Sequence, residues 1–449
     1  MKKKLIFLTF LLFSQSPLAK SLAAGPMLGH VAMRGANIWL QSPEKGEVSI
    51  IYWPSKQPKE KTVLTAVVDD DFNHVHTFKL KGLEPDTDYT YTFKINNKKI
   101  KPAKNYNFKT QQLWLWRTDP PEFSVLAGSC TFVNETEYDR PGEPYGSDFE
   151  IFDQIASEDA DVMLWLGDNW YYREVDFAAE QNLLHRATRD RQQPMFQQVF
   201  SKFANYGTWD DHDFGPNNAG AEFIFKDQAL KIFKKFWANP SYGTPEQKGV
   251  FTRVHYNDIE YFMLDNRYNK SYETAQDGPD KVFYGKQQLD WLKNSLLSSY
   301  APFKFIVGGG QMLNDHHPYE GWDKYRYERD AFIQWLDEHK ITGVVFLSGD
   351  KHHTELLKMQ RPDAYPLYEL TCSPMTAGTH SSKGSGDLDN PRLVENTLVN
   401  EHNYCKMTFT GPQNDRSMRI DVIGKDGQQY WTKQIKSSVL SYSQVNDSQ

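Results

Sequence analysis

The sequence predicts a small all-β sandwich over residues 24–112, followed by a larger α/β domain over residues 122–438. In the first part, apolar and polar residues alternate along short segments, as they do in strands that bury one face. In the second part, apolar strands alternate with amphipathic helical stretches, which is typical of sheets flanked by helices. Residues 113–121 are expected to be a linker, and residues 439–449 a polar tail.

The first part contains five predicted strands with turn residues between them. They are ANIWLQS (36–42), GEVSIIYWP (46–54), KTVLTAVV (61–68), HVHTFKLKGL (74–83) and DYTYTFKI (88–95). The stretch GLEPDTDYTYTFKIN resembles the end of a fibronectin type III sandwich, where a Leu-x-Pro turn leads into a Tyr-rich strand. We therefore expect a fibronectin III-like sandwich here.

The second part contains six apolar strands, followed by four more strands toward the C-terminus. The six are predicted at 123–130, 161–168, 204–213, 259–267, 304–311 and 343–350. The other four are predicted at 367–374, 404–411, 418–424 and 429–435. The amphipathic helices between strands are predicted at 148–158, 225–238, 286–297 and 328–339. The Gly/Ser-rich residues 379–387 are expected to form a loop.

The N-terminus has the pattern of a secretory signal peptide over residues 1–23. Lys2, Lys3 and Lys4 precede the apolar run LIFLTFLLF, and the small residues in SLAAG suit cleavage near Ala23. This run is too short to span a bilayer core of roughly 30 Å, and no other stretch reaches spanning length. We therefore expect an exported protein, periplasmic or secreted, without a transmembrane segment.

Charge and cysteine content give further information about the function of the protein and its covalent structure. Asp and Glu outnumber Lys and Arg by 58 to 51, which argues against a dedicated nucleic-acid binder because such proteins neutralise phosphates with Lys and Arg. Of the three cysteines, Cys372 and Cys405 fall in successive predicted strands. If those strands pair, the two Cα atoms lie within the roughly 4.4–6.8 Å that a disulfide needs. Cys130 would then be left without a disulfide partner, and its thiol is expected to have a different role. We expect a monomer.

The strands of the α/β domain end on polar residues of similar chemistry. These residues are Cys130, Asp168, Asp210 to Asp213, Asp265, Gln311 and Asp350, with His352 close behind. Ligands bind at the carboxyl ends of strands in open α/β sheets. Acidic groups that converge on one edge repel each other strongly unless cations lie among them. The sequence therefore predicts metal binding at this edge.

The types of donor atom indicate two metal sites. One set offers a thiolate, a carboxylate, a phenolate and an imidazole: Cys130, Asp168, Tyr171 and His352. This set suits a strongly Lewis-acidic ion such as Fe³⁺. The other set is all-oxygen, shares Asp168, and suits a hard ion such as Ca²⁺: Asp211, Gln311 and Asp350. Two ions bridged by one carboxylate can stabilise both oxygens of a phosphoryl transfer.

Seven motifs, in order, resemble the alkaline phosphatase D (PhoD-like) family of calcineurin-like metallophosphoesterases. They are GSC, LGDNWY, WDDHDFGPNNAG, LDNR, YGKQQLDWL, EGWDKYRYER and FLSGDKHHTEL. The resemblance covers nearly the whole mature chain, including the N-terminal sandwich. It implies a fold of mixed sheets flanked by helices and hydrolysis of phosphate esters at alkaline pH. It also implies an iron–calcium centre in which Cys130, Asp168, Tyr171 and His352 would hold iron. Asp211 and Asp350 would hold calcium, with Asp168 bridging.

Other residues near these motifs have two interpretations. Gln311 is a plausible ligand, although His316 or His317 is an alternative. His212 is expected to protonate the leaving oxygen, with Asp213 orienting its imidazole; alternatively His212 caps a helix or supports a ligand.

Asn217, Asn218 and Arg267 are candidate contacts to phosphate. For Arg267 the alternative is a bracing role beside Asp265.

The function expected from these residues is hydrolysis of phosphate mono- or diesters, with water activated by the metals as nucleophile. A phospholipase-type phosphodiesterase on the same scaffold is the nearest alternative. Specificity for the leaving group of the ester is expected to be determined by loops 139–147, 269–284 and 376–403. A non-catalytic surface protein with structural metals is a third reading, against which His212 argues, because a structural site needs no proton donor.

Overall fold

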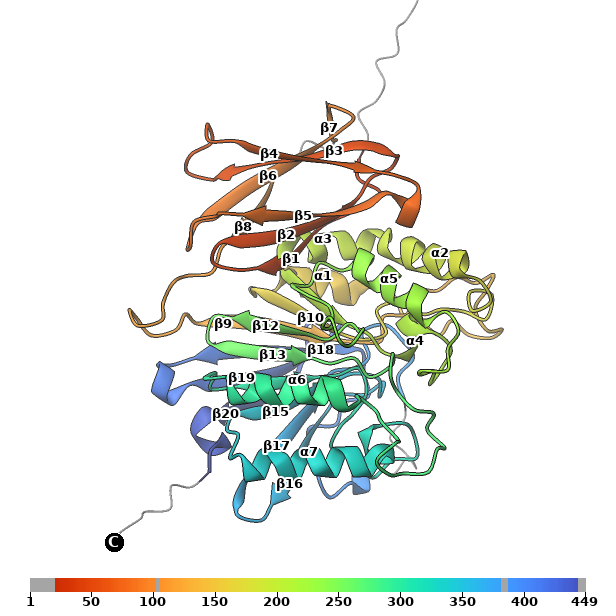
Figure 1. Ribbon diagram of the computed structural model, residues 1–449, viewed down its shortest axis with the longest axis vertical. Helices are drawn as coiled ribbons and strands as arrows, with labels where there is room; N and C mark the ends of the chain where they lie inside the picture. Colours follow the sequence, from red (N-terminus) through yellow and green to blue (C-terminus); the bar gives the residue numbers. More distant parts are fainter. Residues whose placement is uncertain (1–20, 102–104, 381–386, 443–449) are drawn as a thin grey trace, which may run out of the picture.

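The computed structural model describes residues 21–101, 105–380 and 387–442. Most of the predicted signal peptide, the centre of the Gly/Ser-rich loop and the last seven residues of the predicted tail lie outside them. Within these residues the strands form four sheets (Figure 1). No helix in the described part of the chain has both the length and the apolar character to cross a membrane.

The N-terminal part is a sandwich of two antiparallel sheets, as predicted. The first sheet has the order β1 (Ala24–Val31), β2 (Gly35–Gln41), β5 (Val75–Lys81). The second has the order β4 (Thr62–Val68), β3 (Gly46–Pro54), β6 (Asp88–Ile95), β7 (Lys98–Lys99), with β8 (Tyr106–Lys109) also paired to β6. Buried and less buried residues alternate along β6, which is the pattern of a strand that covers a core with one face.

The α/β part contains two mixed six-stranded sheets. The first has the order β11 (Ala204–Thr208), β10 (Val162–Leu166), β9 (Phe123–Gly128), β18 (Asn403–Thr410), β19 (Ser417–Gly424), β20 (Gln429–Lys436). The second has the order β12 (Thr252–Tyr256), β13 (Ile259–Met263), β14 (Lys304–Val307), β15 (Val344–Ser348), β17 (Ala364–Thr371), β16 (Glu355–Arg361). The ten predicted strands are all among them.

Helices flank this pair of sheets (Figure 1). On the side of the N-terminal sandwich lie α1 (Glu150–Ser157), α2 (Glu180–Arg191), α3 (Pro194–Lys202) and α5 (Lys226–Phe236), with the short α4 (Asp211–Phe214) at the strand ends. On the other side lie α6 (Lys286–Leu297) and α7 (Arg326–Glu338). The 3₁₀ turns are η1 (Asp71–His74), η2 (Trp322–Tyr325), η3 (Asp387–Asp389), η4 (Gln413–Asp415) and η5 (Ser437–Leu440).

The central strands are buried on both faces. Along β10, Leu164 and Leu166 join the core between the two sheets, whereas Met163 and Trp165 join the cluster under the helices. The N-terminal sandwich packs onto that cluster, since the Trp39 indole donates to the Lys235 carbonyl over 2.8 Å. The sandwich therefore forms an outer layer over the helices of the α/β part.

The C-terminal boundary differs from the prediction. The polar tail was expected to begin at residue 439, yet Leu440 is fully buried, and its carbonyl accepts a hydrogen bond from the Gly343 amide over 2.8 Å. Tyr442 donates to the Leu336 carbonyl over 3.0 Å. The folded domain thus extends at least to Tyr442, because η5 closes one end of the core.

The disulfide between Cys372 and Cys405 is confirmed, with a Cα–Cα distance of 5.9 Å. Cys372 directly follows β17 in the second sheet, and Cys405 lies on β18 in the first sheet. The bond joins the two sheets rather than neighbouring strands of one sheet, so the pairing assumed for these strands was wrong although the bond was right. Cys130 is a buried free thiol.

Candidate metal centre and active site

The carboxyl ends of strands from both sheets meet at one edge of the domain. In the first sheet β9, β10 and β11 are parallel and lead into Cys130, Asp168 and Asp211. In the second sheet β15 leads into Asp350 and His352. Ligand atoms of Cys130, Asp168 and His352 lie within 4.8 Å of one another, as do those of Asp168, Asp211 and His212.

The four residues predicted to hold iron come together. The Cys130 sulfur lies 3.6 Å from Asp168 Oδ2, and the Tyr171 hydroxyl donates to the same oxygen over 3.2 Å. The Tyr171 hydroxyl is also 3.4 Å from His352 Nε2. All four side chains are buried. A thiol, a phenol, a carboxyl and an imidazole that converge in this way form a donor set suited to one transition-metal ion.

The backbone at these residues adopts a conformation that non-glycine residues rarely take. The φ angle is 59° at Cys130, 53° at Asp168, 69° at Asp350 and 55° at His352. Each such residue costs roughly 1–3 kcal/mol and persists only where surrounding contacts impose it, which is common at functional sites. The strand ends therefore bend so that their side chains face one point.

The electrostatics of this edge also favour cations. Burial and the neighbouring carboxylates raise the pKa of Asp168 far above its ordinary value, and burial with Glu320 and Asp211 raises the pKa of Asp350 to about 7. Asp211 Oδ1 is buried without a hydrogen-bond partner. Buried carboxylates of this kind are stabilised by metal ions, so the residues present fit a metal centre.

His352 is held at its second nitrogen. Its Nδ1 lies 3.0 Å from the hydroxyl of Tyr145, which leaves Nε2 facing Tyr171 and Asp168. A hydrogen bond at one ring nitrogen fixes the orientation of a metal-binding imidazole. The sequence reading did not single out Tyr145, although it lies in one of the loops expected to shape the site.

The second donor set differs in part from the prediction. Asp211 and Asp350 lie together, and Asp210 and Glu320 join them within 4.8 Å. The amide of Gln311 donates to Glu355 over 2.7 Å and to Thr371 over 2.8 Å, and its oxygen accepts from Asn314 over 3.0 Å. In this structure the Gln311 carboxamide is thus engaged in a buried polar network, and its coordination of a metal ion stays a prediction.

The alternative ligands His316 and His317 also lie outside the second set. His316 contacts Asp315 over 2.6 Å. His317 is buried, with its Nε2 3.9 Å from Asp323. Glu320, three residues further on, is the residue of this segment that reaches the metal edge. Glu320 begins the motif EGWDKYRYER, and the sequence analysis gave it no role in the site.

The side chain of Arg267 contacts acidic residues inside the site, which is the arrangement expected for its bracing role. Its side chain is fully buried and donates to both oxygens of Glu320 over 2.6 and 3.0 Å, and to Asp210 over 2.5 Å. Lys270 adds a contact to Glu320 over 2.7 Å. The Arg267 guanidinium thus contacts Asp210 and Glu320, whereas the Asp265 carboxylate accepts from the backbone N–H of Arg267 and not from its side chain. Asp210 and Glu320 are thus neutralised by cations, whereas Asp211 and Asp350 remain available.

His212 and Asp213 do not form the predicted pair. The carboxylate of Asp213 accepts from the Asn169 amide groups and from the Asp210 N–H, and it does not orient the imidazole. It instead fixes the turns that carry Asp168 and Asp211. The ring of His212 stacks on that of Tyr171 with centroids 4.3 Å apart, and the backbone N–H of His212 donates to Asp168 Oδ1 over 3.2 Å.

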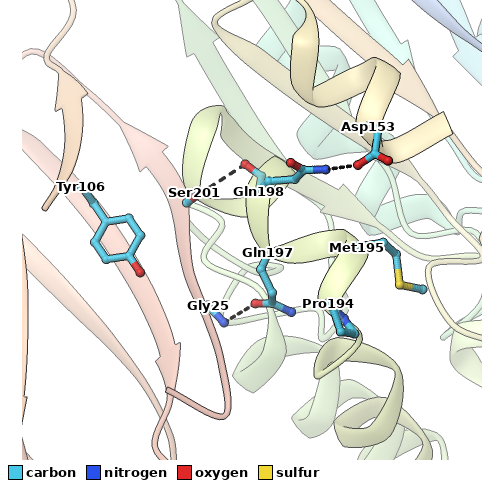
Figure 2. A pocket seen from close by; sticks show the side chains of 8 residues that line it. All are labelled: Gly25, Tyr106, Asp153, Pro194, Met195, Gln197, Gln198 and Ser201. Carbon is cyan, nitrogen blue, oxygen red and sulfur yellow. Dashed lines mark hydrogen bonds between the residues drawn. The ribbon is translucent and has the colours of Figure 1, made fainter. Parts of the chain in front are cut away.

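A cavity of about 280 Å³ opens onto both donor sets. Its lining residues are Tyr145, Asp168, Asp211, His212, Asn217, Asn218, Tyr319, Glu320, Asp350, Lys351, His352 and His380. Asn217 and Asn218 are exposed there, and the Asn218 N–H donates to Asp211 over 2.7 Å. A second hollow, of about 450 Å³, lies between the sandwich and helices α1 and α3 and shares no lining residue with it (Figure 2).

Two facing mixed sheets with helices outside and metal donors at their strand ends define the calcineurin-like metallophosphoesterase class of fold. The chain is similar to the solved structure of PhoD, with a TM-score of 0.77 and 15% sequence identity. The match covers 96% of this chain and 93% of the PhoD chain. It is also similar to the purple acid phosphatase PPD1 from yellow lupin (Lupinus luteus), with a TM-score of 0.67 and 12% sequence identity. That match covers 92% of this chain and 74% of the lupin chain.

The chain belongs to the PhoD-like phosphatase family, whose sequence pattern matches residues 129–421. Residues 19–113 match a domain of unknown function, DUF7800. Alkaline phosphatase D of Bacillus subtilis (strain 168) is 22% identical over 320 residues, which are 60% of this chain and 52% of that protein. The chain thus spans about half the length of the curated relative that it matches.

Proposed function

We propose that this protein is an exported, metal-dependent phosphoesterase that hydrolyses phosphate mono- or diesters. The observation that carries the proposal is the pair of donor sets that share Asp168 and open into one cavity. Membership of the PhoD-like phosphatase family and the relative named alkaline phosphatase D support the same reaction class.

The proposed ions are Fe³⁺ and Ca²⁺. Cys130, Tyr171 and His352 would hold iron, since thiolate and phenolate are donors for a strongly Lewis-acidic ion. Asp211 and Asp350 would hold calcium, for which carboxylate oxygens are suitable, and Asp168 lies between the two sets. When bound, such a pair of ions activates water and neutralises charge on the phosphoryl oxygens.

The residues around the cavity would bind and orient the ester. Asn217 and Asn218 are exposed at the cavity, where their amides would donate to phosphoryl oxygens. His212 faces the same space beside Asp168 and Asp211 and would protonate the leaving oxygen. Tyr145 and His380 line the cavity. They belong to two of the loops that are expected to determine specificity for the leaving group.

Export is supported by the chain's own chemistry. The signal-peptide pattern of residues 1–23 would direct secretion, and a buried disulfide is typical of an oxidising compartment. These two features support the proposed periplasmic or secreted location. The chain is proposed to act there as a monomer on small-molecule phosphate esters.

The reaction is tested with the purified mature protein, before and after treatment with a chelator. Hydrolysis of p-nitrophenyl phosphate and bis(p-nitrophenyl) phosphate is measured, and iron and calcium are then added back singly and together. We expect activity to be lost with the metals and to return only with both ions. The ratio of rates on the two esters distinguishes a monoesterase from a diesterase. Absence of hydrolysis of either ester by fully loaded protein would favour the non-catalytic alternative.

A further inference from the structure

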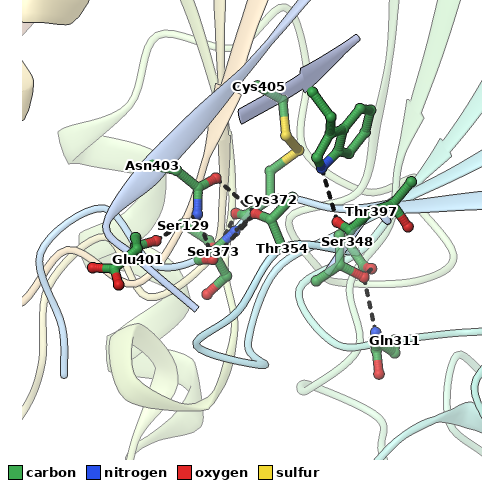
Figure 3. The surroundings of a disulfide bond; sticks show 12 residues. Ser129, Gln311, Ser348, Thr354, Cys372, Ser373, Thr397, Glu401, Asn403 and Cys405 are labelled. Atoms are coloured by element: carbon green, nitrogen blue, oxygen red, sulfur yellow. Dashed lines mark hydrogen bonds between the residues drawn. A yellow bond between two sulfur atoms is a disulfide. The ribbon is translucent and has the colours of Figure 1, made fainter. Parts of the chain in front are cut away.

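The segment after β17 carries a hydroxyl that touches the sulfur of Cys130. Ser373 follows Cys372 of the disulfide and is fully buried (Figure 3). Its hydroxyl donates to the Cys130 sulfur over 3.1 Å. The sequence reading gave Ser373 no role, since a single Ser after a strand carries no pattern.

The proton of this hydroxyl is available for the sulfur. The backbone N–H of His352 donates to Ser373 Oγ over 3.0 Å and so uses an oxygen lone pair, which leaves the O–H free to donate. The Ser129 hydroxyl is 3.4 Å from the sulfur but only 2.9 Å from the Cys372 carbonyl. A hydroxyl has one proton, and the shorter contact takes it. Ser373 is therefore the principal donor to the sulfur.

Ser373 is held from both sheets. Its N–H donates to Thr354 Oγ1 over 3.0 Å, and its carbonyl accepts from Asn403 Nδ2 over 3.2 Å. The Thr354 hydroxyl in turn donates to Asn403 Oδ1 over 2.7 Å. The adjacent disulfide ties the segment to Cys405 on β18 (Figure 3). Cys405 pairs with Ala127 of β9, the strand that leads to Cys130. The hydroxyl is thus fixed relative to the strand end that carries Cys130.

We infer that Ser373 is a positioning residue for the metal centre, which fixes the Cys130 sulfur and sets its strength as a donor. The inference rests on the proposed function, because it requires Cys130 to hold a metal ion. A hydrogen bond to a ligating sulfur draws electron density from it and tunes the metal that it binds. Through the His352 N–H, the same hydroxyl also supports the loop of a second proposed ligand.

The test uses full-length mature protein from which metals have been removed, titrated with Co²⁺. In the wild type, Co²⁺ bound by Cys130 gives a thiolate-to-cobalt charge-transfer band. Without the hydrogen bond the sulfur electrons are held less tightly, so Ser373→Ala should move this band to longer wavelength. Loss of a supporting partner typically weakens metal binding by roughly 10–100-fold, and we expect a decrease in that range. Far-UV circular dichroism checks that the variant is folded.

Two comparisons separate this role from a purely structural one. Ser373→Thr and Ser373→Val have nearly the same shape and differ in the hydroxyl, so only Ser373→Thr should keep the wild-type band. Ser348→Ala is the matched control, since Ser348 (labelled in Figure 3) is equally buried. Its hydroxyl contacts Thr371 over 3.0 Å instead of a sulfur. It should bind Co²⁺ as the wild type does.

The inference is overturned if Ser373→Ala and Ser373→Val keep the wild-type band position and Co²⁺ affinity. A different result addresses the proposed function itself. If the wild type and Cys130→Ala give the same Co²⁺ spectrum, Cys130 is not a ligand, and the proposed metal centre fails together with the role of Ser373.

Discussion

Removal of the disulfide should lower the stability of the α/β domain by an amount that follows from its position in the chain. Cys372 and Cys405 are separated by 33 residues, and both side chains are fully buried. Cross-linking a loop of this length restricts the unfolded chain by about 3.7 kcal/mol at 25 °C in the chain-entropy treatment. The double variant Cys372→Ala/Cys405→Ala should therefore have a free energy of unfolding lower by about 4 kcal/mol.

Urea denaturation followed by tryptophan fluorescence measures this difference. The control is the wild type in the presence of a strong reductant, in which the unfolded chain is no longer cross-linked. Its unfolding curve should move to that of the double variant. A decrease below about 1 kcal/mol, in either the variant or the reduced wild type, would contradict the loop-closure reasoning and the view that the bond clamps the two sheets.

Three further outcomes are expected at the metal edge. Asp168→Asn should remove bound metal and ester hydrolysis together, because an amide lacks the charge shared by both donor sets; metal content per chain measures this. His212→Ala should keep its metal while turnover of alkyl esters falls by about 10²–10⁴-fold, and less for p-nitrophenyl phosphate; metal loss would instead identify His212 as a ligand. Chelator-treated protein should lose stability as pH rises from about 4 to about 7. Asp350 keeps its proton in the folded state up to a pKa of about 7, whereas the unfolded chain releases it near 3.8. Asp350→Asn should reduce that slope in urea titrations.

Much of the site was predictable because strand ends converge by geometry. Once β9, β10 and β15 are recognised as parallel strands within their sheets, Cys130, Asp168 and Asp350 must follow at one edge. Tyr171 could be added because it stands three residues after Asp168, in the loop that leaves the same strand.

Side-chain direction in loops was not predictable. Gln311 follows three glycines after β14, and its amide donates to Glu355 and Thr371 in a buried network. The role of Arg267 depends on Glu320, which arrives from a loop more than fifty residues away along the chain. The local sequence around Gln311 and Arg267 does not predict these contacts, because they depend on which buried polar side chains lie close together in the folded state.

Helix α2 was missed because its buried face is charged. Arg186 is buried and donates to Asp176 over 2.8 Å and to Glu135 over 2.5 Å. Arg191 is buried against the rings of Trp170 and Trp237. Hydrophobic periodicity predicts helices that bury apolar side chains. A helix that buries arginines lacks this pattern, and its sequence resembles that of an exposed loop.

The central claim is that a thiol, a phenol, a carboxylate and an imidazole at the strand ends hold the iron of a phosphoesterase. The most direct measurement is the iron content and visible absorption of the purified protein beside those of Tyr171→Phe, with ester hydrolysis assayed on the same samples. We predict stoichiometric iron in the wild type and a charge-transfer band that Tyr171→Phe shifts or abolishes. Full hydrolytic activity in a preparation shown to contain no iron would contradict the account.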